Sequence, residues 1–509
     1  MSVRVRFAPS PTGPLHMGGV RTALYNYLFA KKHKGSFLLR IEDTDQTRYI
    51  PGAEAYIMDA LTWCGLPWDE GPGKDGPYGP YRQSERKALY KQYAMQLVDG
   101  GNAYYAFDTP EELDEMRKRI EKEKSGNPQY DCRTRGEMKN SLTMPETEVK
   151  QRIESGEPFV IRVKTPEDEE VVVNDLIRGT VRVNSHLLDD KVLFKSDGMP
   201  TYHLANVVDD YLMKITHVIR GEEWLPSAPL HVLLYRYLGW SDNMPAFAHL
   251  PLLLKPDGHG KLSKRDGDRL GFPVFPLQWT DPESGSISRG YREDGYFPEA
   301  FINILALLGW NPGTEQELFS MQELIDTFSL ERVGKAGARF DPDKARWFNH
   351  QYLQKKPVTD IADGFEKVLK DKGHHADRET LHQIVALVRE RADFIHELWE
   401  QSDFFFEAPH DYEPGFVKKK WKGDTSALMR KLARTLETME QFDVNSIDRV
   451  IQSFMEENAL NPGKLMPGLR LALVGAGRGP DVKEIMAMIG KKEVIDRIEK
   501  AVDTLPDES

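Results

Sequence analysis

The sequence predicts a multidomain α/β protein: a doubly wound (Rossmann-type) domain that is split by an α/β insertion, followed by an all-helical C-terminal region. Residues 3–41 contain a strand, a turn-rich loop, a helix and a second strand, which is the repeating unit of doubly wound folds. Strand and helix patterns alternate again over residues 192–238, so the same domain resumes after the intervening segment. After about residue 336, helical patterns follow one another with few strand signals.

The N-terminal unit follows from its hydrophobic pattern. Residues 3–8 alternate between apolar and charged side chains and stop before a proline, as expected for a strand. Residues 9–14 are rich in Pro, Ser, Thr and Gly and predict a loop. Residues 20–32 carry apolar side chains at helical spacing, and residues 37–41 predict the second strand.

The composition and hydrophobic pattern of the sequence change at about residue 109. A charged helical stretch over residues 111–124 leads into a part of the chain that is rich in turns. Short strands are expected there at residues 159–164, 170–173 and 179–183. We interpret this part of the chain as a domain inserted into the doubly wound fold.

The later part of the chain contains loops and then helices. Residues 256–294 are rich in Gly, Pro and Asp and predict loops with little core; we interpret residues 281–290 within them as a disordered surface insertion. Long helices are expected over residues 381–399 and 485–502. The changes in pattern divide the chain into five predicted segments: 1–108, 109–190, 191–255, 256–335 and 336–509.

Composition restricts the class of protein. The chain has 509 residues, which suits several domains, and its 40% hydrophobic and 29% charged residues are ordinary for a soluble protein. We expect a cytoplasmic protein, because no apolar run could span a bilayer and the N-terminus lacks the pattern of a signal or transit peptide. The two cysteines, Cys64 and Cys132, fit a reducing compartment, with a single bridge between them as the alternative.

The charge of the chain bears on nucleic-acid binding. The formal net charge of -12 argues mildly against it, since phosphate contacts need Lys and Arg. Binding depends on local patches, however, and basic stretches occur at residues 418–422 and 464–478. The alternative is that these stretches are solvated helix faces.

The first candidate site lies at the start of the first predicted helix. His16 is followed by Met17, Gly18 and Gly19. A helix N-terminus directs N–H groups and a positive dipole at anions, and glycines let a nucleotide approach the backbone. His16 can also donate to phosphate oxygens. The alternative is a strand-to-helix turn that needs these residues only for its shape.

The second candidate site is a basic loop. Lys261 and Lys264 flank Ser263 and could counter the charge that develops on a leaving pyrophosphate. A solvated basic loop is the alternative. A P-loop is excluded, because Lys255 stands where its first Gly is required and Leu262 stands where Ser or Thr should follow the Lys.

The two sites together are more specific than either alone. A His-x-Gly-x motif near the N-terminus and a later Lys-x-Ser-Lys loop resemble the two signatures of class I aminoacyl-tRNA synthetases. The segments around them are similar, in the same order, to those of bacterial-type glutamyl-tRNA synthetases. The resemblance covers essentially the whole chain and is carried by residues 6–13, 40–45, 202–206, 219–224, 340–344 and 346–349, and by Gly477, Ile485, Gly490 and Arg497.

The resemblance implies a reaction and its partners. ATP, with Mg²⁺ on its phosphates, would activate L-glutamate to glutamyl-adenylate, and the glutamyl group would pass to the terminal adenosine of tRNA-Glu, or of both tRNA-Glu and tRNA-Gln. Residues 1–108 and 191–255 would form the catalytic domain and 109–190 the acceptor-stem-binding insertion. Residues 256–335 would form a connecting, stem-contact region, and 336–509 the anticodon-binding region. We expect a monomer without membrane association.

The resemblance also implies a glutamate site. Arg6 and Arg220 would hold the substrate carboxylates, since guanidinium matches carboxylate in a planar two-bond geometry. Glu42 would bind the ammonium group. The other residues expected to bind glutamate are Ser10, Tyr202, Asn206 and Trp224. For Tyr202 and Trp224 the alternative is core packing.

By the same resemblance, ATP would meet both motifs. The residues expected to bind ATP are His16, Gly18, Gly19, Glu223 and Lys264. The residues expected to take part in catalysis are His16, Gly18, Lys261 and Lys264.

The chain departs from the family pattern in two places. Many members carry a zinc site near the start of the inserted domain, but residues 104–108 contain no Cys or His here. Cys132 alone cannot form a tetrahedral site, so we expect no structural zinc and no other bound metal. The insertion at residues 281–290 is the second departure.

Three alternatives remain beside a glutamyl-tRNA synthetase. Glutaminyl-tRNA synthetases share the catalytic fold, but the resemblance places two β-barrels at their C-terminus, where this chain is helical. A short relative that glutamylates a modified anticodon base lacks the C-terminal third. An inactive tRNA-binding paralogue is disfavoured by the intact His16, Gly18, Lys261 and Lys264.

Overall fold

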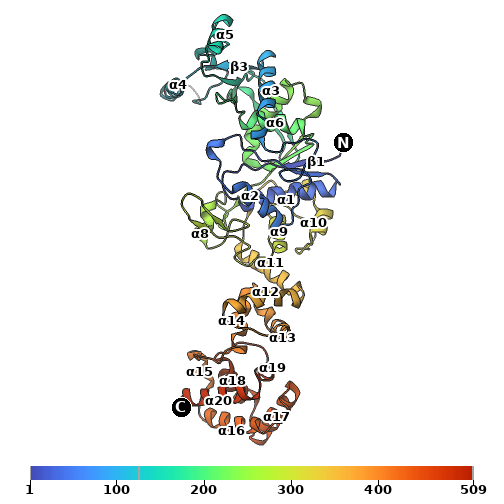
Figure 1. Ribbon diagram of the computed structural model, residues 1–509, viewed down its shortest axis with the longest axis vertical. Coiled ribbons are helices and arrows are strands. Elements are labelled where there is room, and N and C mark those ends of the chain that lie inside the picture. The colour runs from blue at the N-terminus through green and yellow to red at the C-terminus, as the bar shows by residue number, and fades with distance from the viewer. Residues whose placement is uncertain (1, 124–126, 507–509) are drawn as a thin grey trace. The chain divides into compact units, whose positions relative to one another are not determined.

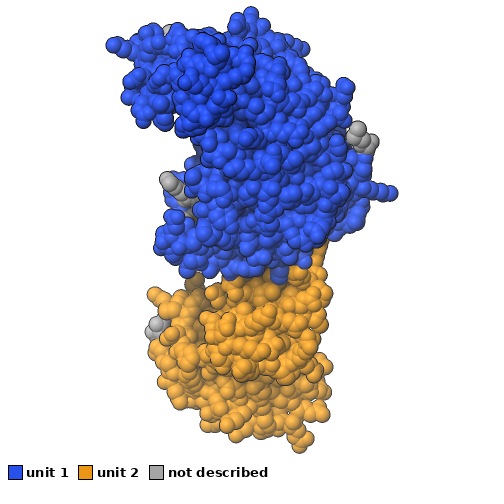
Figure 2. All heavy atoms as spheres, turned by 45° about the horizontal axis from the view of Figure 1, so that its top comes forward, with its two compact units in different colours: residues 1–345 blue, residues 346–509 orange. Residues whose placement is uncertain are grey.

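A computed structural model describes residues 2–123 and 127–506, and the chain forms two compact units. Unit 1 is Met1–Ala345 and unit 2 is Arg346–Ser509 (Figure 2). Unit 1 combines helices with strands, many of which pair in parallel, and the described residues of unit 2 are helical or loop. These features confirm the predicted fold class.

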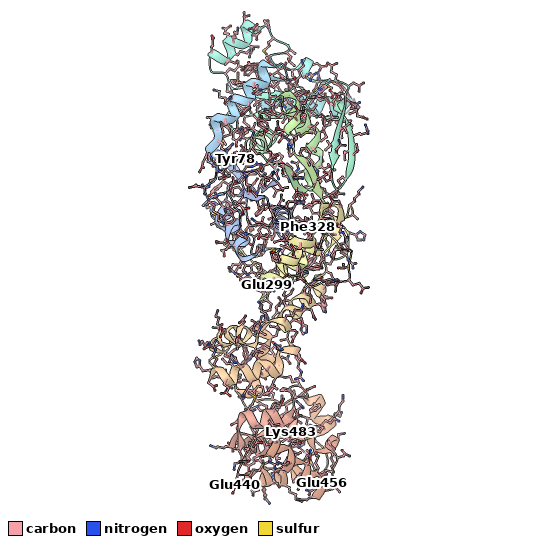
Figure 3. All side chains as sticks on the ribbon, turned by 90° about the vertical axis from the view of Figure 1, so that its right-hand side faces the viewer. Tyr78, Glu299, Phe328, Glu440, Glu456 and Lys483 are labelled. Carbon is pink, nitrogen blue, oxygen red and sulfur yellow. The ribbon has the colours of Figure 1, made fainter. Side chains whose placement is uncertain are left out.

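The strand–helix–strand unit at the N-terminus is present (Figure 1). β1 (Arg4–Phe7) and β2 (Ser36–Leu39) pair in parallel over their whole length. The helix between them, α1 (Met17–Lys32), starts three residues before the predicted 20–32, because His16 caps its N-terminus and the two glycines adopt helical geometry. One side of α1 packs on Phe328, which Figure 3 labels, through Tyr25 at 5.0 Å between ring centroids.

The two halves of the split domain meet in the middle of unit 1. β8 (His217–Gly221) and β9 (Ala246–Leu250) pair in parallel, and α7 (Ala228–Tyr237) connects them. The N–H of Thr216, just before β8, donates to the carbonyl of Arg4 in β1 at 2.9 Å. The chain therefore returns, after more than 200 residues, to the strand with which it began.

The segment between the halves contains a second sheet. β3 (Ala103–Ala106), β4 (Val160–Val163) and β7 (Val192–Phe194) form three antiparallel strands. The helices α4 (Pro110–Glu123) and α5 (Glu146–Glu154) lie in the same part of the chain (Figure 1). This sheet crosses the segment boundaries predicted at 108/109 and 190/191. β3 lies before the first boundary and β7 after the second, yet both pair with β4.

The remaining strands of this segment join the sheet that contains β8 and β9. β5 (Glu170–Asp175) and β6 (Gly179–Asn184) pair as an antiparallel hairpin. The last residue of β5 lies opposite Phe247 in β9, which gives the sheet order β6-β5-β9-β8. A hydrophobic pattern identifies a strand but not its long-range partner, so this pairing could not be read from the sequence.

The loop-rich stretch after β9 has more core than predicted. Val274, Phe275, Leu277 and Tyr291 are buried, which contradicts the expectation of little core in residues 256–294. The chain also forms regular structure there. Its elements are β10 (Leu253–Leu254) paired with β13 (Ala338–Arg339), α8 (Lys264–Leu270), and β11 (Trp279–Thr280) paired with β12 (Ile287–Ser288).

The interpretation of residues 281–290 as disordered is wrong. They form the turn and return strand of the β11–β12 hairpin. The Asp281 carboxylate accepts hydrogen bonds from the N–H groups of Glu283 and Ser284, at 3.1 and 2.8 Å, and Gly285 takes a positive φ of 69°. An Asx turn of this kind orders polar residues without a hydrophobic core, which explains why a count of apolar residues missed it.

The other helices of unit 1 surround these sheets. They are α2 (Ala53–Trp63), α3 (Lys87–Asp99), α6 (Tyr202–Leu212), α9 (Pro298–Leu307) and α10 (Met321–Thr327). Within the described residues, no helix of either unit has both the length and the apolar character needed to cross a bilayer.

The C-terminal part of unit 2, from Phe404 to Val502, is built on a core of helices around the fully buried Trp421. Polar contacts join its outer faces, as between Lys483 (labelled in Figure 3) and Asp448, at 2.8 Å. The helices are α11 (Pro342–Lys355), whose first four residues belong to unit 1, α12 (Val358–Asp371), α13 (Arg378–Val388), α14 (Leu398–Ser402), α15 (Pro414–Lys420), α16 (Thr425–Glu437), α17 (Val444–Glu457), α18 (Pro462–Val474), α19 (Val482–Ile489) and α20 (Lys491–Thr504).

Both long helices predicted in unit 2 are broken. The stretch 381–399 is divided between α13 and α14, with short 3₁₀ turns between them. The stretch 485–502 breaks at Gly490, whose φ of 86° no right-handed helix accommodates. Helical spacing of apolar residues continues across each break, because both helices of a pair pack on one core.

Candidate active site

A cavity of about 450 Å³ lies at the carboxyl ends of β1 and β8, beside the start of α1. In doubly wound folds ligands bind at this edge of the sheet. Many of the residues predicted to bind glutamate or ATP line it, although they come from distant parts of the sequence. They are Arg6, Ser10, His16, Gly18, Gly19, Glu42, Tyr202, Asn206, Arg220, Glu223 and Trp224.

The start of α1 has the geometry of an anion site. The Nδ1 atom of His16 accepts a hydrogen bond from the N–H of Gly18 at 3.1 Å and so caps the helix. An accepting Nδ1 places the ring proton of the neutral imidazole on Nε2. In this tautomer the ring can donate to a phosphate oxygen.

The two glycines of this motif serve different needs. A Cβ atom on Gly19 would come within 2.5 Å of Leu15 Cδ1, so Gly19 fits the local packing. A Cβ atom on Gly18 would come no closer than 3.5 Å to any neighbour, an ordinary contact distance. Packing therefore does not require Gly18, and we attribute its lack of a side chain to what the cavity binds.

Charged side chains form a network below the cavity. Arg6 donates to both carboxylate oxygens of Asp210, at 3.0 and 3.3 Å. Arg40 donates to the same Asp210 carboxylate at 2.7 Å and to Oε1 of Glu42 at 2.9 Å. The side-chain amide of Asn206 also donates to Oε1 of Glu42, at 3.0 Å.

The network favours the charged forms of Arg40 and Asp210. Burial opposes the charge on Arg40, but the carboxylates of Asp210 and Glu42 outweigh it and hold the pKa of Arg40 well above its ordinary value. Burial also acts to raise the pKa of Asp210, yet Arg6 and Arg40 lower it below the ordinary value.

The network leaves binding capacity toward the cavity. Within the described part of the chain, Oε2 of Glu42 and Nη1 of Arg6 make no hydrogen bond. Both side chains line the cavity. A carboxylate oxygen and a guanidinium nitrogen are therefore available for an ammonium group and a carboxylate of a ligand.

Arg220, in β8, also lines the cavity. Its Nη1 donates to the Tyr202 hydroxyl at 2.7 Å, and its Nη2 donates to the carbonyl of Trp224 at 3.3 Å. The two aromatic rings lie 4.3 Å apart. Burial raises the pKa of Tyr202, so its hydroxyl remains protonated and able to donate to a ligand. Trp224 is 40% exposed and is not a core residue.

Arg6 and Arg220 both line the cavity but differ in their partners. Arg6 pairs with the Asp210 carboxylate, whereas Arg220 donates to no carboxylate among the described residues. Two further pairs at the cavity, Arg48 with Asp45 and Lys261 with Glu223, are neutral overall. A guanidinium without a carboxylate partner can receive a carboxylate of a ligand.

Residues 2–347 match the catalytic domain of class I tRNA synthetases (E and Q), the group for glutamate and glutamine. The chain belongs to this family. Residues 356–502 of the synthetase match an anticodon binding domain.

Relatives of the synthetase share nearly its whole length. It is 57% identical over 503 residues to the glutamate–tRNA ligase of Christiangramia forsetii, and 56% identical over 504 residues to that of Porphyromonas gingivalis, with 99% of each chain covered. Its fold matches the crystal structure of a glutamate–tRNA ligase from Elizabethkingia meningosepticum in complex with its amino acid. That match has a TM-score of 0.96 and 53% identity and covers 99% of this chain and 100% of the other.

The Lys-x-Ser-Lys loop of the synthetase lies at the edge of the cavity. Lys261 does not line the cavity, but its Nζ is 2.9 Å from Glu223, which does. The side chain of Lys264, the first residue of α8, lies outside the described residues. The backbone N–H and the hydroxyl of Ser263, just before α8, both donate to Oδ2 of Asp266, at 2.9 and 2.5 Å, and these hydrogen bonds lower the pKa of Asp266 to about 2. Ser263 thus has a structural role at the start of α8.

Sequence reasoning missed two residues of the charged network, Arg40 and Asp210. Local spacing contains a signal for both. Arg40 and Glu42 are two residues apart in an extended segment, so their side chains point the same way. Asp210 follows Asn206 by four residues on α6, which places both on one helix face.

Many family members carry zinc at the segment that corresponds to residues 104–108, and in this chain protein contacts hold that segment. The Tyr104 hydroxyl donates to Asp190 at 2.6 Å, and Tyr104 packs in a cluster with Met116, Tyr130 and Met138. Among residues 2–123 and 127–506, no group of three or more His, Cys, Asp or Glu side chains could hold a metal ion. That no structural zinc is bound stays a prediction.

The basic stretches of unit 2 have mixed roles. The lysines of residues 418–420 are exposed in the last turn of α15, where positive charge favours the helix dipole. Arg470 instead donates to the carbonyls of Arg478 and Pro480, each at 2.8 Å, and Arg478 pairs with Asp403. Part of the stretch 464–478 therefore stabilises its own loop.

Proposed function

We propose that this chain is a glutamate–tRNA ligase, which activates L-glutamate with ATP and transfers the glutamyl group to the terminal adenosine of tRNA-Glu. The observation that carries the proposal is the site at the carboxyl ends of β1 and β8, where Arg220 lines the cavity and, among the described residues, donates to no carboxylate. The full-length relatives at 56–57% identity bear the name glutamate–tRNA ligase, which supports the same conclusion.

Each polar group of glutamate has a matching group in the site. Arg6 and Arg220 would hold the two carboxylates, and Oε2 of Glu42 would accept from the ammonium group. Ser10, Tyr202, Asn206 and Trp224 complete the wall around the amino acid. Glutamine, whose side chain is neutral, would leave the guanidinium that receives the side-chain carboxylate without a charged partner.

The first step would be attack of the glutamate α-carboxylate on the α-phosphate of ATP, with pyrophosphate as the leaving group. The chain would contribute position and charge. The N–H groups at the start of α1, with His16, would bind phosphate oxygens, and Lys261 and Lys264 would offset the charge that develops on pyrophosphate. Mg²⁺ would enter on the phosphates of ATP, as part of that substrate.

The second step would join the activated amino acid to RNA. A ribose hydroxyl of the terminal adenosine would attack the carbonyl carbon of glutamyl-adenylate, and AMP would leave. We propose that residues 109–190 bind the acceptor stem, that 256–335 contact the stem, and that 336–509 bind the anticodon. The match of residues 356–502 to an anticodon binding domain supports the last assignment. We further propose that the enzyme acts as a cytoplasmic monomer.

A charging assay tests the proposal directly. Separately transcribed tRNA-Glu and tRNA-Gln are each incubated with ATP, Mg²⁺ and either labelled glutamate or labelled glutamine. Formation of glutamyl-tRNA-Glu is the expected result, and the tRNA-Gln reaction shows whether that RNA is also a substrate. Formation of glutaminyl-tRNA, or of no aminoacyl-tRNA, would overturn the proposal in favour of a glutaminyl enzyme or an inactive paralogue.

A further inference from the structure

The specificity candidate Arg220 has a third partner that lies outside the cavity wall. Its Nε donates to Nε2 of His249, in β9, at 3.0 Å. On the other side of the ring, Nδ1 of His249 lies 2.6 Å from Oδ2 of Asp175, at the end of β5. The side chains of His249 and Asp175 are both 0% exposed.

The chemistry of the donors allows only one proton arrangement for the neutral ring. The Nε of arginine always carries a hydrogen and can only donate. Nε2 of His249 must therefore accept, and the ring proton sits on Nδ1, where it is donated to Asp175. The carboxylate thus selects the tautomer that can hold Arg220.

Asp175 is itself fixed by the backbone. Its Oδ1 accepts from the N–H groups of Ile177 and Arg178, at 2.9 and 2.7 Å. Its Oδ2 accepts from the His249 ring and from the backbone N–H of His249, at 3.1 Å. Every one of these contacts uses Asp175 as an acceptor, and both oxygens are engaged.

We propose that Asp175 and His249 are positioning residues, which orient the guanidinium of Arg220 to receive a carboxylate of the substrate. This inference rests on the proposed function, because it assigns a role to Arg220 in glutamate binding. Neither positioning residue touches the cavity, and neither stands among the motifs that the sequence singles out.

The N–H groups of the Arg220 guanidinium are divided between its protein partners and the cavity. A guanidinium has five N–H groups. His249, Tyr202 and Trp224 take three of them, one on each nitrogen. One N–H remains on each terminal nitrogen, and this pair suits a planar two-bond contact with a carboxylate. Without His249, the guanidinium could rotate about its terminal bonds and lose that alignment.

The electrostatics keep the ring in the accepting form. Burial lowers the pKa of His249, and the positive charge of Arg220 lowers it further, against the opposing effect of Asp175. The ring is therefore neutral at neutral pH. The backbone on either side is also held, since Nε of Arg178 donates to the carbonyl of His249 at 3.1 Å.

A residue of the inserted segment thus bears on the proposed specificity for glutamate. Asp175 belongs to residues 109–190, whereas Arg220 and His249 belong to the second half of the catalytic domain. β5 reaches the site because it pairs with β9 opposite Phe247. A carboxylate from the insertion would thus determine how a catalytic-domain arginine meets the amino acid.

The central test compares two substitutions of His249. His249→Phe keeps a ring but removes the acceptor, whereas His249→Gln places an amide oxygen near the position of Nε2. The KM for glutamate and the KM for ATP are measured in tRNA charging, with the other substrates saturating. We expect His249→Phe to raise the glutamate KM about tenfold or more and to change the ATP KM less than about twofold, since a hydrogen bond to a charged group is lost. His249→Gln should recover most of the loss.

A double-mutant cycle tests the role of Asp175. Asn has a single acceptor oxygen, so Asp175→Asn must present a donor either to the backbone N–H groups or to Nδ1 of His249. We expect this substitution alone to raise the glutamate KM, and to add little in the His249→Phe background. His217→Phe, at the other end of β8, is the matched control and should leave the glutamate KM unchanged. Thermal unfolding of each variant separates loss of fold from loss of position.

The outcomes distinguish the inference from the proposed function. An unchanged glutamate KM in His249→Phe, or equal losses in the Phe and Gln variants for both substrates, would overturn the inference while the wild type still forms glutamyl-tRNA. Additive effects of the two substitutions would also overturn it, because independent losses mean that Asp175 does not act through His249. A wild-type enzyme that forms no glutamyl-tRNA would overturn the proposed function, and the inference with it.

Discussion

Nη1 of Arg40 donates to Oδ1 of Asp210 at 2.7 Å, and the Arg40 side chain is 0% exposed. The same carboxylate receives Arg6, and the other end of Arg40 reaches Glu42. Arg40, which itself does not line the cavity, thus holds Glu42 directly and Arg6 through Asp210. The geometry of the proposed amino-acid site depends on this buried ion network.

Arg40→Met should destabilise the protein by about 3–5 kcal/mol, because it leaves buried carboxylates with one cation fewer. The measurement is the free energy of unfolding in urea. Arg182→Met is a matched control in β6, since its ion pair with Glu170 is more than half exposed, and it should cost less than about 1 kcal/mol. Equal effects of the two substitutions would show that the buried network adds no more than a surface pair.

Arg220→Gln should weaken glutamate binding by about 2–5 kcal/mol, since a buried carboxylate loses its charged partner. The ATP KM should change little, because Arg220 lies on the amino-acid side of the site. Arg48→Gln is the control: Arg48 also lines the cavity, but it is exposed and paired with Asp45. If the glutamate KM and kcat of Arg220→Gln match the wild type, the role in specificity moves to Arg6.

Lys264→Ala should slow adenylate formation by ~10²–10³, the usual effect of removing one donor to developing charge. Its effect on tRNA affinity should be small. Arg269→Ala removes a neighbouring positive charge whose contact is with Asp266 in the same helix, and it should leave the rate nearly unchanged. Single-turnover formation of glutamyl-adenylate with bound tRNA gives the rate, and a wild-type rate for Lys264→Ala would exclude the loop from catalysis.

Gly18→Ala should separate folding from ATP binding. A Cβ atom there meets no close neighbour, and Ala is favoured over Gly in a helix by roughly 0.5–1 kcal/mol, so the melting temperature should be unchanged or higher. The ATP KM should rise, because the methyl group occupies space at the start of α1. An unchanged ATP KM would mean that the nucleotide does not approach Gly18.

The stability of unit 1 should fall as the pH falls from about 6.5 to 4. Burial lowers the pKa of His203 from 6.5 to about 4, and burial also lowers the pKa of His231, 3.3 Å away, well below 6.5. The unfolded chain binds these protons first, so acid favours unfolding in this window, by at most about 1.4 kcal/mol per pH unit for each histidine. His203→Gln should reduce the slope, as urea unfolding at several pH values would show; an unchanged slope would place the proton uptake elsewhere.

Local patterns were enough to predict much of this protein. Alternation identified β1, and helical spacing identified α1 and most of unit 2. A helix-start motif led to His16 and the family resemblance led to Arg220, and both line one cavity. These features succeed because a strand, a helix or a helix N-terminus depends on residues that are neighbours in sequence.

Only the tertiary structure decided which distant residues meet. Arg6 and Asp210 are 204 residues apart, and Asp175 and His249 are 74 apart, yet each pair makes direct hydrogen bonds. The pairing of β5 with β9 belongs to the same class of contact. Periodicity shows which face of an element is buried but not what lies against it, because a partner is chosen by packing and charge across the whole fold. The sequence alone therefore led to the residues that we propose meet the substrate, and the fold identified those that hold them in place.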